Sequence, residues 1–170
     1  MVTLYEASRS LDEQRSRLTG GDVCVAVYGL GKMGLPLAGV FAETTHVVVG
    51  VDVYESVVRR VNDGECHFTG EPGLPKLVAE QAAEGSLRAT TSAREAAAAG
   101  AVHVIIVPTP LTDDDEPDLS MLTAAVESVG AGLDPGDVLF VECTVPPGTC
   151  RDVVVPLLEA ESGLNSDEFG

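Results

Sequence analysis

Residues 23–38 read VCVAVYGLGKMGLPLA and join a strand-like segment to a glycine-rich turn and the start of a helix. Valines at alternate positions are typical of a buried strand, and the apolar residues after the turn suit a helix. The turn contains the spacing GxGxxG, with Gly29, Gly31 and Gly34. Between a strand and a helix, this spacing predicts a site for the pyrophosphate of a dinucleotide.

Each glycine has a separate expected role in such a site. Gly29 allows the tight turn off the strand, and Gly31 leaves no side chain between the backbone and a pyrophosphate. Gly34 lets the helix pack close to the strand. The amide groups that open the helix, at the positive end of its dipole, would face the phosphates.

An acidic residue follows at the position that binds ribose in these sites. A second expected strand, His46–Val51, ends at Asp52, close to the usual spacing of about 20 residues after the glycines. Its carboxylate can accept both ribose hydroxyls and would repel a 2′-phosphate, which favours NAD over NADP. FAD and S-adenosylmethionine sites also use an acidic residue here, so they remain alternatives.

Length and hydropathy favour a globular protein that is not embedded in a membrane. The chain has 170 residues, 45% of them hydrophobic, enough for one domain with a sizeable core. No apolar run approaches the roughly 20 residues of a membrane span. The polar, charged N-terminus does not resemble a secretory signal, so we expect a cytoplasmic location and no membrane partner.

The charge is strongly negative. With 27 acidic and 10 basic residues, the formal net charge is −17, which disfavours nucleic-acid binding. Acidic surfaces are a device of halophiles, and strong salt would reduce the repulsion of an anionic cofactor. We therefore expect a salt-adapted source, with an ordinary acidic protein as the alternative. The four cysteines and three histidines show no metal-ligand spacing, and no metal site is expected.

Strands and helices alternate along the chain. Further strands are expected at Leu87–Thr90, Val102–Val107 and Val138–Val141, and helices at Tyr54–Asp63, Leu74–Glu84, Ala93–Ala99, from Asp118 or Ser120 to about Ala131, and Thr149–Glu161. This order predicts an α/β fold, a Rossmann-type doubly wound parallel sheet with helices on both faces. We expect residues 1–20 to form a helical extension, with a helix at Leu4–Leu18 that carries a narrow apolar stripe of Leu4, Leu11 and Leu18. A disordered leader is the alternative. Residues 21–170 are expected to form the dinucleotide-binding domain.

Two further loops should reach the same site, because ligands bind beyond the carboxyl ends of parallel strands. One begins with Pro108 and Thr109, and the other with Glu142, Cys143 and Thr144. The threonine hydroxyls could contact a cofactor there, and ordinary rigid turns are the alternative.

Four motifs occur along the chain in the same order as in a known protein family. They are GLGKMGLPLA at 29–38, EPGL at 71–74, VPTPL at 107–111 and ECTVPPGT at 142–149. The chain resembles the nucleotide-sugar dehydrogenases over residues 22–170, and the VPTPL form is closest to the UDP-N-acetyl-D-mannosamine branch. With the glycine turn, Asp52 and the two loops, the resemblance implies that NAD is bound by Gly29, Leu30, Gly31, Lys32, Met33, Gly34, Asp52, Pro108, Thr109, Glu142 and Thr144. Lys32 and Met33 depart from the family's usual aromatic–aliphatic pair, and Cys143 stands where Ser is usual.

The resemblance also implies an activity, an NAD-dependent oxidation of a CH–OH group. The sugar C6 alcohol of a UDP-sugar becomes a carboxylate in two steps with two NAD, through a cysteine thioester, in polysaccharide biosynthesis. The family's catalytic residues belong to a central helical region and a UDP-sugar domain, so this chain alone is expected to bind NAD without turnover, with no catalytic residue of its own. UDP-glucose 6-dehydrogenase, a non-catalytic NAD-sensing module and a different Rossmann oxidoreductase remain alternatives, and a homo-oligomer is possible.

Overall fold

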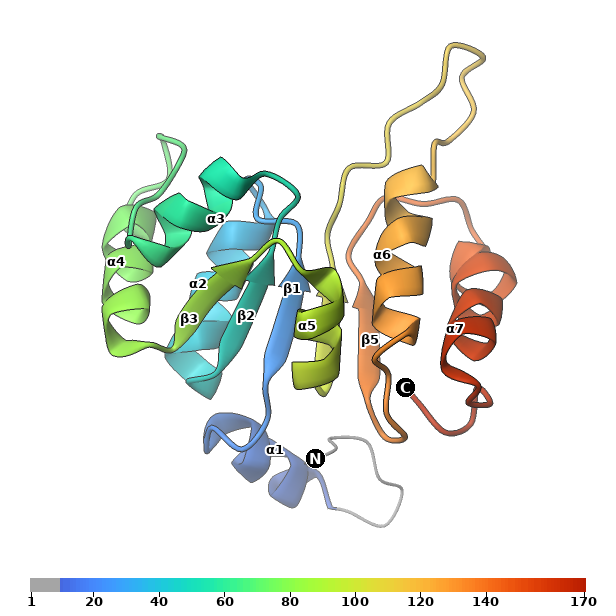
Figure 1. The fold of residues 1–170 in the computed structure, drawn as a ribbon, viewed down its shortest axis with the longest axis horizontal. Coiled ribbons are helices and arrows are strands. Elements are labelled where there is room, and N and C mark those ends of the chain that lie inside the picture. The colour runs from blue at the N-terminus through green and yellow to red at the C-terminus, as the bar shows by residue number, and fades with distance from the viewer. Residues whose placement is uncertain (1–9) are drawn as a thin grey trace.

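The computed structural model of the chain describes residues 10–170, and its centre is one parallel sheet (Figure 1). The five strands lie in the order β3-β2-β1-β4-β5. They are β1 (Val25–Tyr28), β2 (Val48–Val51), β3 (Leu87–Thr90), β4 (Val102–Ile105) and β5 (Val138–Val141). All four pairings are parallel, and the expected fold class is confirmed.

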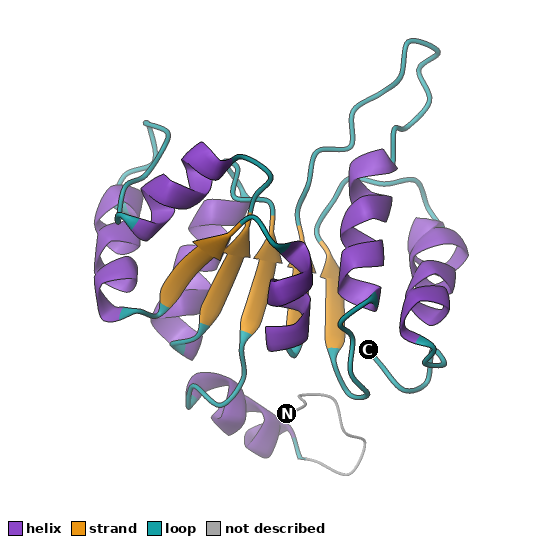
Figure 2. Cartoon of the chain, in the orientation of Figure 1, coloured by secondary structure: helices purple, strands orange, loops and turns teal. Residues whose placement is uncertain are grey.

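Helices cover both faces of the sheet (Figure 2). They are α2 (Gly34–Thr45), α3 (Glu55–Asn62), α4 (Leu74–Glu84), α5 (Ala93–Ala99), α6 (Ser120–Gly130) and α7 (Val155–Ser162). The first three contribute to one apolar core and the last three to a second core on the opposite face. Every residue of β1, β2 and β4 is buried, as expected for strands covered on both sides.

The connections reverse direction between β1 and β4, which are neighbours in the sheet. The chain leaves β1 through α2 on one face and leaves β4 through α6 on the other. Such a reversal opens a crevice beyond the carboxyl ends of the two strands. The sheet order therefore places the glycine turn and the loop after β4 on opposite sides of one crevice.

The N-terminal helix is shorter, within the described residues, than the expected Leu4–Leu18. It is α1 (Leu11–Thr19), and residues 4–9 lie outside the described part of the chain. Ser10 begins it with a capping box, in which its hydroxyl accepts from the Glu13 amide and the Glu13 carboxylate accepts from the Ser10 amide. This arrangement satisfies two amide groups at the helix start. Of the three leucines of the expected stripe, Leu4 lies outside the described residues, Leu11 is 82% exposed and Leu18 packs against the core.

Several expected boundaries differ from the structure. The second strand begins at Val48, because His46 ends α2 in a left-handed conformation with φ 64°. The fourth strand ends at Ile105, and Val107 belongs to the loop beyond it. The final helix opens with a π-helical turn, Cys150–Val154, before α7.

Three polar side chains meet inside the second core. The Tyr28 hydroxyl lies 3.2 Å from His103 Nδ1, and His103 Nε2 lies 3.7 Å from a carboxylate oxygen of Asp137. Because Nε2 faces a carboxylate, we assign the ring proton to Nε2 and the donor role to the Tyr28 hydroxyl. Both His103 and Asp137 are fully buried, so this set joins β1, β4 and the start of β5 by polar contacts within an apolar layer.

Candidate dinucleotide-binding site

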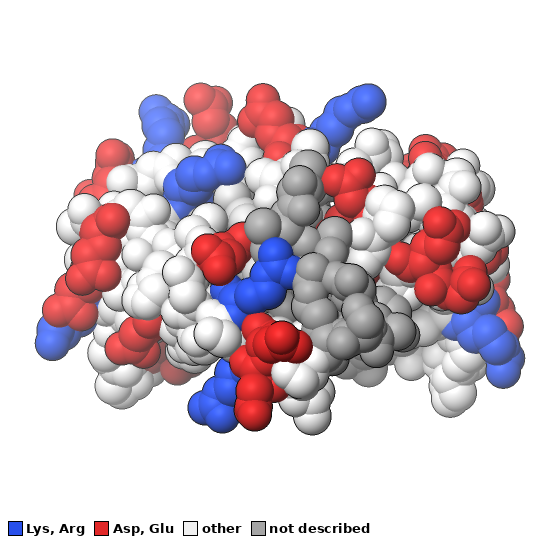
Figure 3. All heavy atoms as spheres, turned by 90° about the horizontal axis from the view of Figure 1, so that it is seen from below, with Lys and Arg blue, Asp and Glu red and all other residues white. Residues whose placement is uncertain are grey.

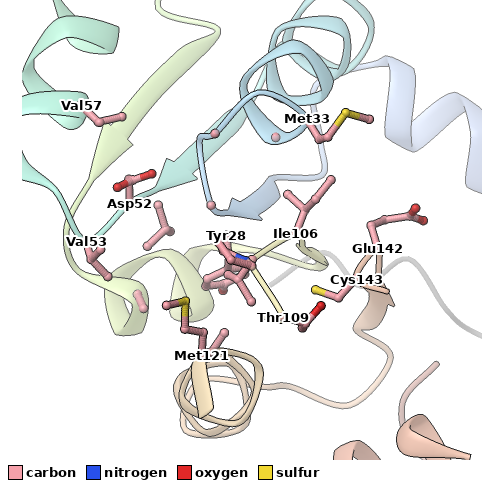
Figure 4. A pocket seen from close by; sticks show the side chains of 18 of the residues that line it. Tyr28, Met33, Asp52, Val53, Val57, Ile106, Thr109, Met121, Glu142 and Cys143 are labelled. Atoms are coloured by element: carbon pink, nitrogen blue, oxygen red, sulfur yellow. The ribbon is translucent and has the colours of Figure 1, made fainter. Parts of the chain in front are cut away.

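A cavity of about 870 Å³ lies beyond the carboxyl ends of the strands, at the reversal between β1 and β4. Figure 4 shows Asp52 and Val53 at one end of it and Glu142 and Cys143 at the other. Met121, from α6, faces the cavity from the side opposite the glycine turn. An elongated crevice of this kind suits a ligand with two separate ends.

The glycine turn is shaped by close backbone packing. Gly29 has φ +100°, and a β-carbon there would collide with the Ile106 carbonyl oxygen. A β-carbon on Gly34 would collide with the Gly29 carbonyl and lie 2.9 Å from the Ile106 side chain. Both positions therefore require glycine, the first for its dihedral angle as well as for space.

Gly31 differs from the other two, because a β-carbon there would meet no protein atom within 4 Å. It is exposed and lines the cavity. The space that a side chain would occupy is therefore cavity space. A cradle of backbone that is open on the ligand side fits a pyrophosphate group.

The start of α2 adds a favourable electrostatic environment to the turn. Met33 precedes the helix, and no side chain caps it. The first amides of a helix lack partners within the helix, and the helix dipole makes this end positive. Lys32 also lines the cavity and carries a positive charge. These groups form a fitting environment for phosphate oxygens.

Asp52 lies at the end of β2, and its carboxylate is held in place from both sides. Oδ2 accepts a hydrogen bond from the Leu30 amide at 3.0 Å, and Oδ1 accepts one from the Tyr54 amide at 3.0 Å. Each oxygen keeps a further lone pair for a ligand hydroxyl. The same carboxylate therefore holds the glycine turn and offers acceptors to the cavity.

The opposite end of the cavity is formed by the loops after β4 and β5. The Thr109 hydroxyl donates to the Thr144 carbonyl oxygen at 2.8 Å, which links the two loops. Cys143 lies beside them, and its thiol donates to the Ile105 carbonyl at 3.5 Å. Burial raises the pKa of the Cys143 thiol, so this thiol stays protonated and is a poor nucleophile.

Nearly all of the predicted site residues come together here. Every member of the predicted set lines the cavity except Leu30, whose side chain is fully buried in the core. Leu30 instead takes part through its amide, which binds Asp52.

Sequence reasoning missed the apolar walls of the cavity and one histidine. Val53 and Tyr54, exposed just after Asp52, line one end, and Met121 comes from α6. His67 reaches the wall from the loop between α3 and α4. Val53 and Tyr54 directly follow Asp52 in the sequence, so their position beside the cavity could have been predicted. The positions of Met121 and His67 depend on packing between distant segments.

Within residues 10–170, no group of three or more His, Cys, Asp or Glu side chains is arranged to hold a metal ion. The helices within residues 10–170 are all too short or too polar to span a membrane.

The parallel sheet, the open glycine turn and the carboxylate at the end of β2 define a Rossmann-type dinucleotide-binding domain. Residues 23–170 match the family model described as the UDP-glucose/GDP-mannose dehydrogenase family, NAD binding domain. The chain belongs to this family, and NAD is its cofactor.

Curated relatives and solved structures agree with this assignment. The chain is 38% identical over 140 residues to a UDP-N-acetyl-D-mannosamine dehydrogenase of Pyrococcus horikoshii, a match that covers 82% of the chain and 32% of the relative. It is 40% identical over 129 residues to an NDP-N-acetyl-D-galactosaminuronic acid dehydrogenase of Ralstonia nicotianae, covering 76% of the chain and 29% of the relative. A ternary complex of GDP-mannose dehydrogenase from Pseudomonas aeruginosa superposes with a TM-score of 0.81 at 31% identity, covering 86% of the chain and 34% of that protein. The matches span about a third of the length of these relatives.

Proposed function

We propose that the chain is the NAD-binding part of a UDP-sugar 6-dehydrogenase that oxidises UDP-N-acetyl-D-mannosamine to its uronic acid with two NAD. The observation that carries this proposal is the 38% identity to a UDP-N-acetyl-D-mannosamine dehydrogenase across most of the chain. UDP-glucose is the alternative substrate. The product, a UDP-linked uronic acid, is suited to a polysaccharide-building transferase.

The chain's own residues would bind and orient the cofactor. The turn around Gly31 and the start of α2 would hold the pyrophosphate, and Asp52 would hold the adenosine ribose. Bound NAD would accept a hydride from the sugar carbon. Thr109 and Thr144, with Pro108 and Glu142, would form the wall at the nicotinamide end, toward which a UDP-sugar would have to come.

The domain boundaries form part of the same proposal. Residues 21–170 would be the NAD-binding domain and residues 1–20 a helical extension. UDP-sugar would be bound mainly by regions that the relatives have beyond the matched third. A non-catalytic NAD sensor is the second candidate, because residues 23–170 match the NAD binding domain of the dehydrogenase family and the match covers about a third of the relatives' length.

Calorimetric titration of the chain with NAD, NADP and UDP-sugars tests this function. We expect NAD to bind more tightly than NADP, and no UDP-sugar oxidation by the chain alone. Tighter binding of NADP would contradict the assignment to Asp52. Turnover of a UDP-sugar would contradict the division of labour between this domain and the rest of the enzyme. A longer protein that carries this domain and oxidises UDP-N-acetyl-D-mannosamine faster than UDP-glucose would support the substrate, and a reversed preference would contradict it.

The strongly negative net charge of the chain supports a further part of the proposal, that the protein works in a salt-rich cytoplasm. On the face drawn in Figure 3, acidic side chains are spread from one end to the other, with separate Lys and Arg groups between them. A net charge of −17 opposes both compaction and the approach of an anionic cofactor. Raising salt toward about 1 M shortens the screening length to about 3 Å. Thermal stability and NAD affinity should therefore both increase with salt, and a decrease in both would contradict this proposal.

A further inference from the structure

The loop between α3 and α4, residues 63–73, brings a histidine to the cofactor cavity. His67 lines the cavity together with Asp52, which comes from the end of β2. The ring lies edge-on to Phe68, with centroids 4.7 Å apart and an interplanar angle of 82°. It is half-buried, and no role in the site described above uses it.

One ring nitrogen of His67 lacks a hydrogen-bond partner. Nδ1 is buried, and no group of the described residues bonds to it. A buried polar atom without a partner is unfavourable, and native structures keep few of them. The torsion that turns an imidazole about its Cβ–Cγ bond is broad, so the ring can turn this nitrogen toward the adjoining cavity without a backbone change.

We propose that His67 is a contact for the bound cofactor, and that its Nδ1 turns into the cavity to bind the adenosine diphosphate half of NAD beside Asp52. Asp52 would bind the ribose from one side, and His67 would approach from the α3–α4 loop. This inference rests on the NAD-binding function of the domain.

The charges around the ring give the contact a pH dependence. Burial lowers the pKa of the His67 imidazole, and Arg60 on α3 lowers it further, whereas Asp52 and the Leu30 backbone act in the opposite direction. The ring is therefore neutral in the free protein near neutral pH. A dinucleotide brings negative phosphates into the cavity, which favours the protonated ring and raises its pKa in the complex. By linkage, NAD binding takes up a proton, so the affinity is highest at low pH and declines as the pH rises through the pKa of the complex.

The test is the affinity of NAD from about pH 5.5 to about pH 8.5, a range that brackets the ordinary histidine pKa. Calorimetry in buffers of different ionisation enthalpy reports the proton uptake directly. For the unaltered chain we expect the affinity to weaken about threefold to tenfold across this range, where a tenfold change corresponds to one pKa unit. His67→Gln should bind NAD more weakly at low pH and show a flat profile with no proton uptake.

His46→Gln is the matched control, because His46 is exposed at the end of α2 and does not line the cavity. It should keep the affinity and the pH profile of the unaltered chain. The ¹⁵N resonances of the His67 ring, assigned by their loss in His67→Gln, should shift when NAD saturates the unaltered chain.

Two results would overturn the proposal. One is unchanged His67 ring resonances on saturation with NAD, a measurement that does not depend on whether a variant folds. The other is a folded His67→Gln variant with the affinity and pH slope of the unaltered chain. Failure of the unaltered chain to bind NAD at any pH would instead contradict the cofactor assignment, so the two failures are distinguishable.

Discussion

The Asp52 carboxylate accepts a hydrogen bond from the Leu30 amide at 3.0 Å, and so connects the end of β2 to the glycine turn after β1. These two residues follow strands that are neighbours in the sheet. One side chain thereby shapes the turn and presents an acceptor to the cavity. An Asp52 substitution should therefore weaken NAD binding in two separable ways, through the loss of the acceptor in the cavity and through the loss of support for the turn.

Asp52→Asn keeps an acceptor for the Leu30 amide but loses the negative charge. Hydrogen bonds to charged groups contribute about 1.5–3 kcal/mol, so we expect NAD affinity to fall by roughly tenfold to a hundredfold. Titration calorimetry measures this loss. Asp52→Ala should lose the same ribose contact and also lower the melting temperature, because the turn loses its support. Asp167→Asn, in the C-terminal segment, is a charge-matched control that should leave the affinity unchanged.

Gly31 and Gly34 should respond oppositely to a small side chain. Gly31→Ala places a methyl group in open cavity space, so the protein should fold normally and lose NAD affinity. Gly34→Ala drives a methyl group into the Gly29 carbonyl, and overpacking of this kind costs about 1–3 kcal/mol. Thermal unfolding and NAD titration of the pair separate the two effects. Equal losses of stability in both variants would contradict this description of the turn.

Thr109 should act by linking the two rim loops. Thr109→Val removes the hydroxyl that donates to the Thr144 carbonyl while it keeps the shape of the side chain. A neutral hydrogen bond contributes about 1 kcal/mol to stability, so the melting temperature should fall by about 2–4 °C, and NAD affinity should fall because the two rim loops are no longer linked. Thr109→Ser retains the hydroxyl and should restore most of the affinity. A Val variant that binds as tightly as the unaltered chain would assign the loop geometry to the prolines instead.

Tyr28 should make the protein sensitive to alkali. Burial, with further contributions from Cys24 and Asp137, raises the pKa of the Tyr28 hydroxyl well above its usual range. In the unfolded chain the phenol ionises near pH 10. Its stabilising contribution is therefore complete below about pH 10 and declines as the pH rises from there toward the pKa of the folded state.

Denaturant titrations at pH values around 10 measure how steeply the free energy of unfolding falls with pH. In Tyr28→Phe, His103 Nδ1 loses its hydrogen-bond partner. The free energy of unfolding at neutral pH should therefore be lower by about 1–3 kcal/mol. The variant should also decline less steeply in alkali. A steeper alkaline decline in Tyr28→Phe would contradict the assignment.

Much of the architecture was predictable from local sequence patterns. The strands Leu87–Thr90 and Val138–Val141 and the helices Leu74–Glu84 and Ala93–Ala99 were predicted with the bounds that the structure has. Short apolar runs, glycines after helices and a capping serine act over a few residues, so they can be read directly. Element ends were less predictable where a single residue adopts an unusual backbone conformation, as at His46.

The sequence by itself determined the class of site, because the glycine spacing and the carboxylate at the end of the second strand are local requirements of a dinucleotide. Only the tertiary structure decided which distant groups share that site. His67 reaches the cavity from a loop, Met121 enters from α6, and Thr109 in the loop after β4 bonds to Thr144 in the loop after β5. The buried Tyr28–His103 contact is of the same kind. Such contacts depend on the order of strands in the sheet and on how helices pack against it, and no short segment encodes either of these alone.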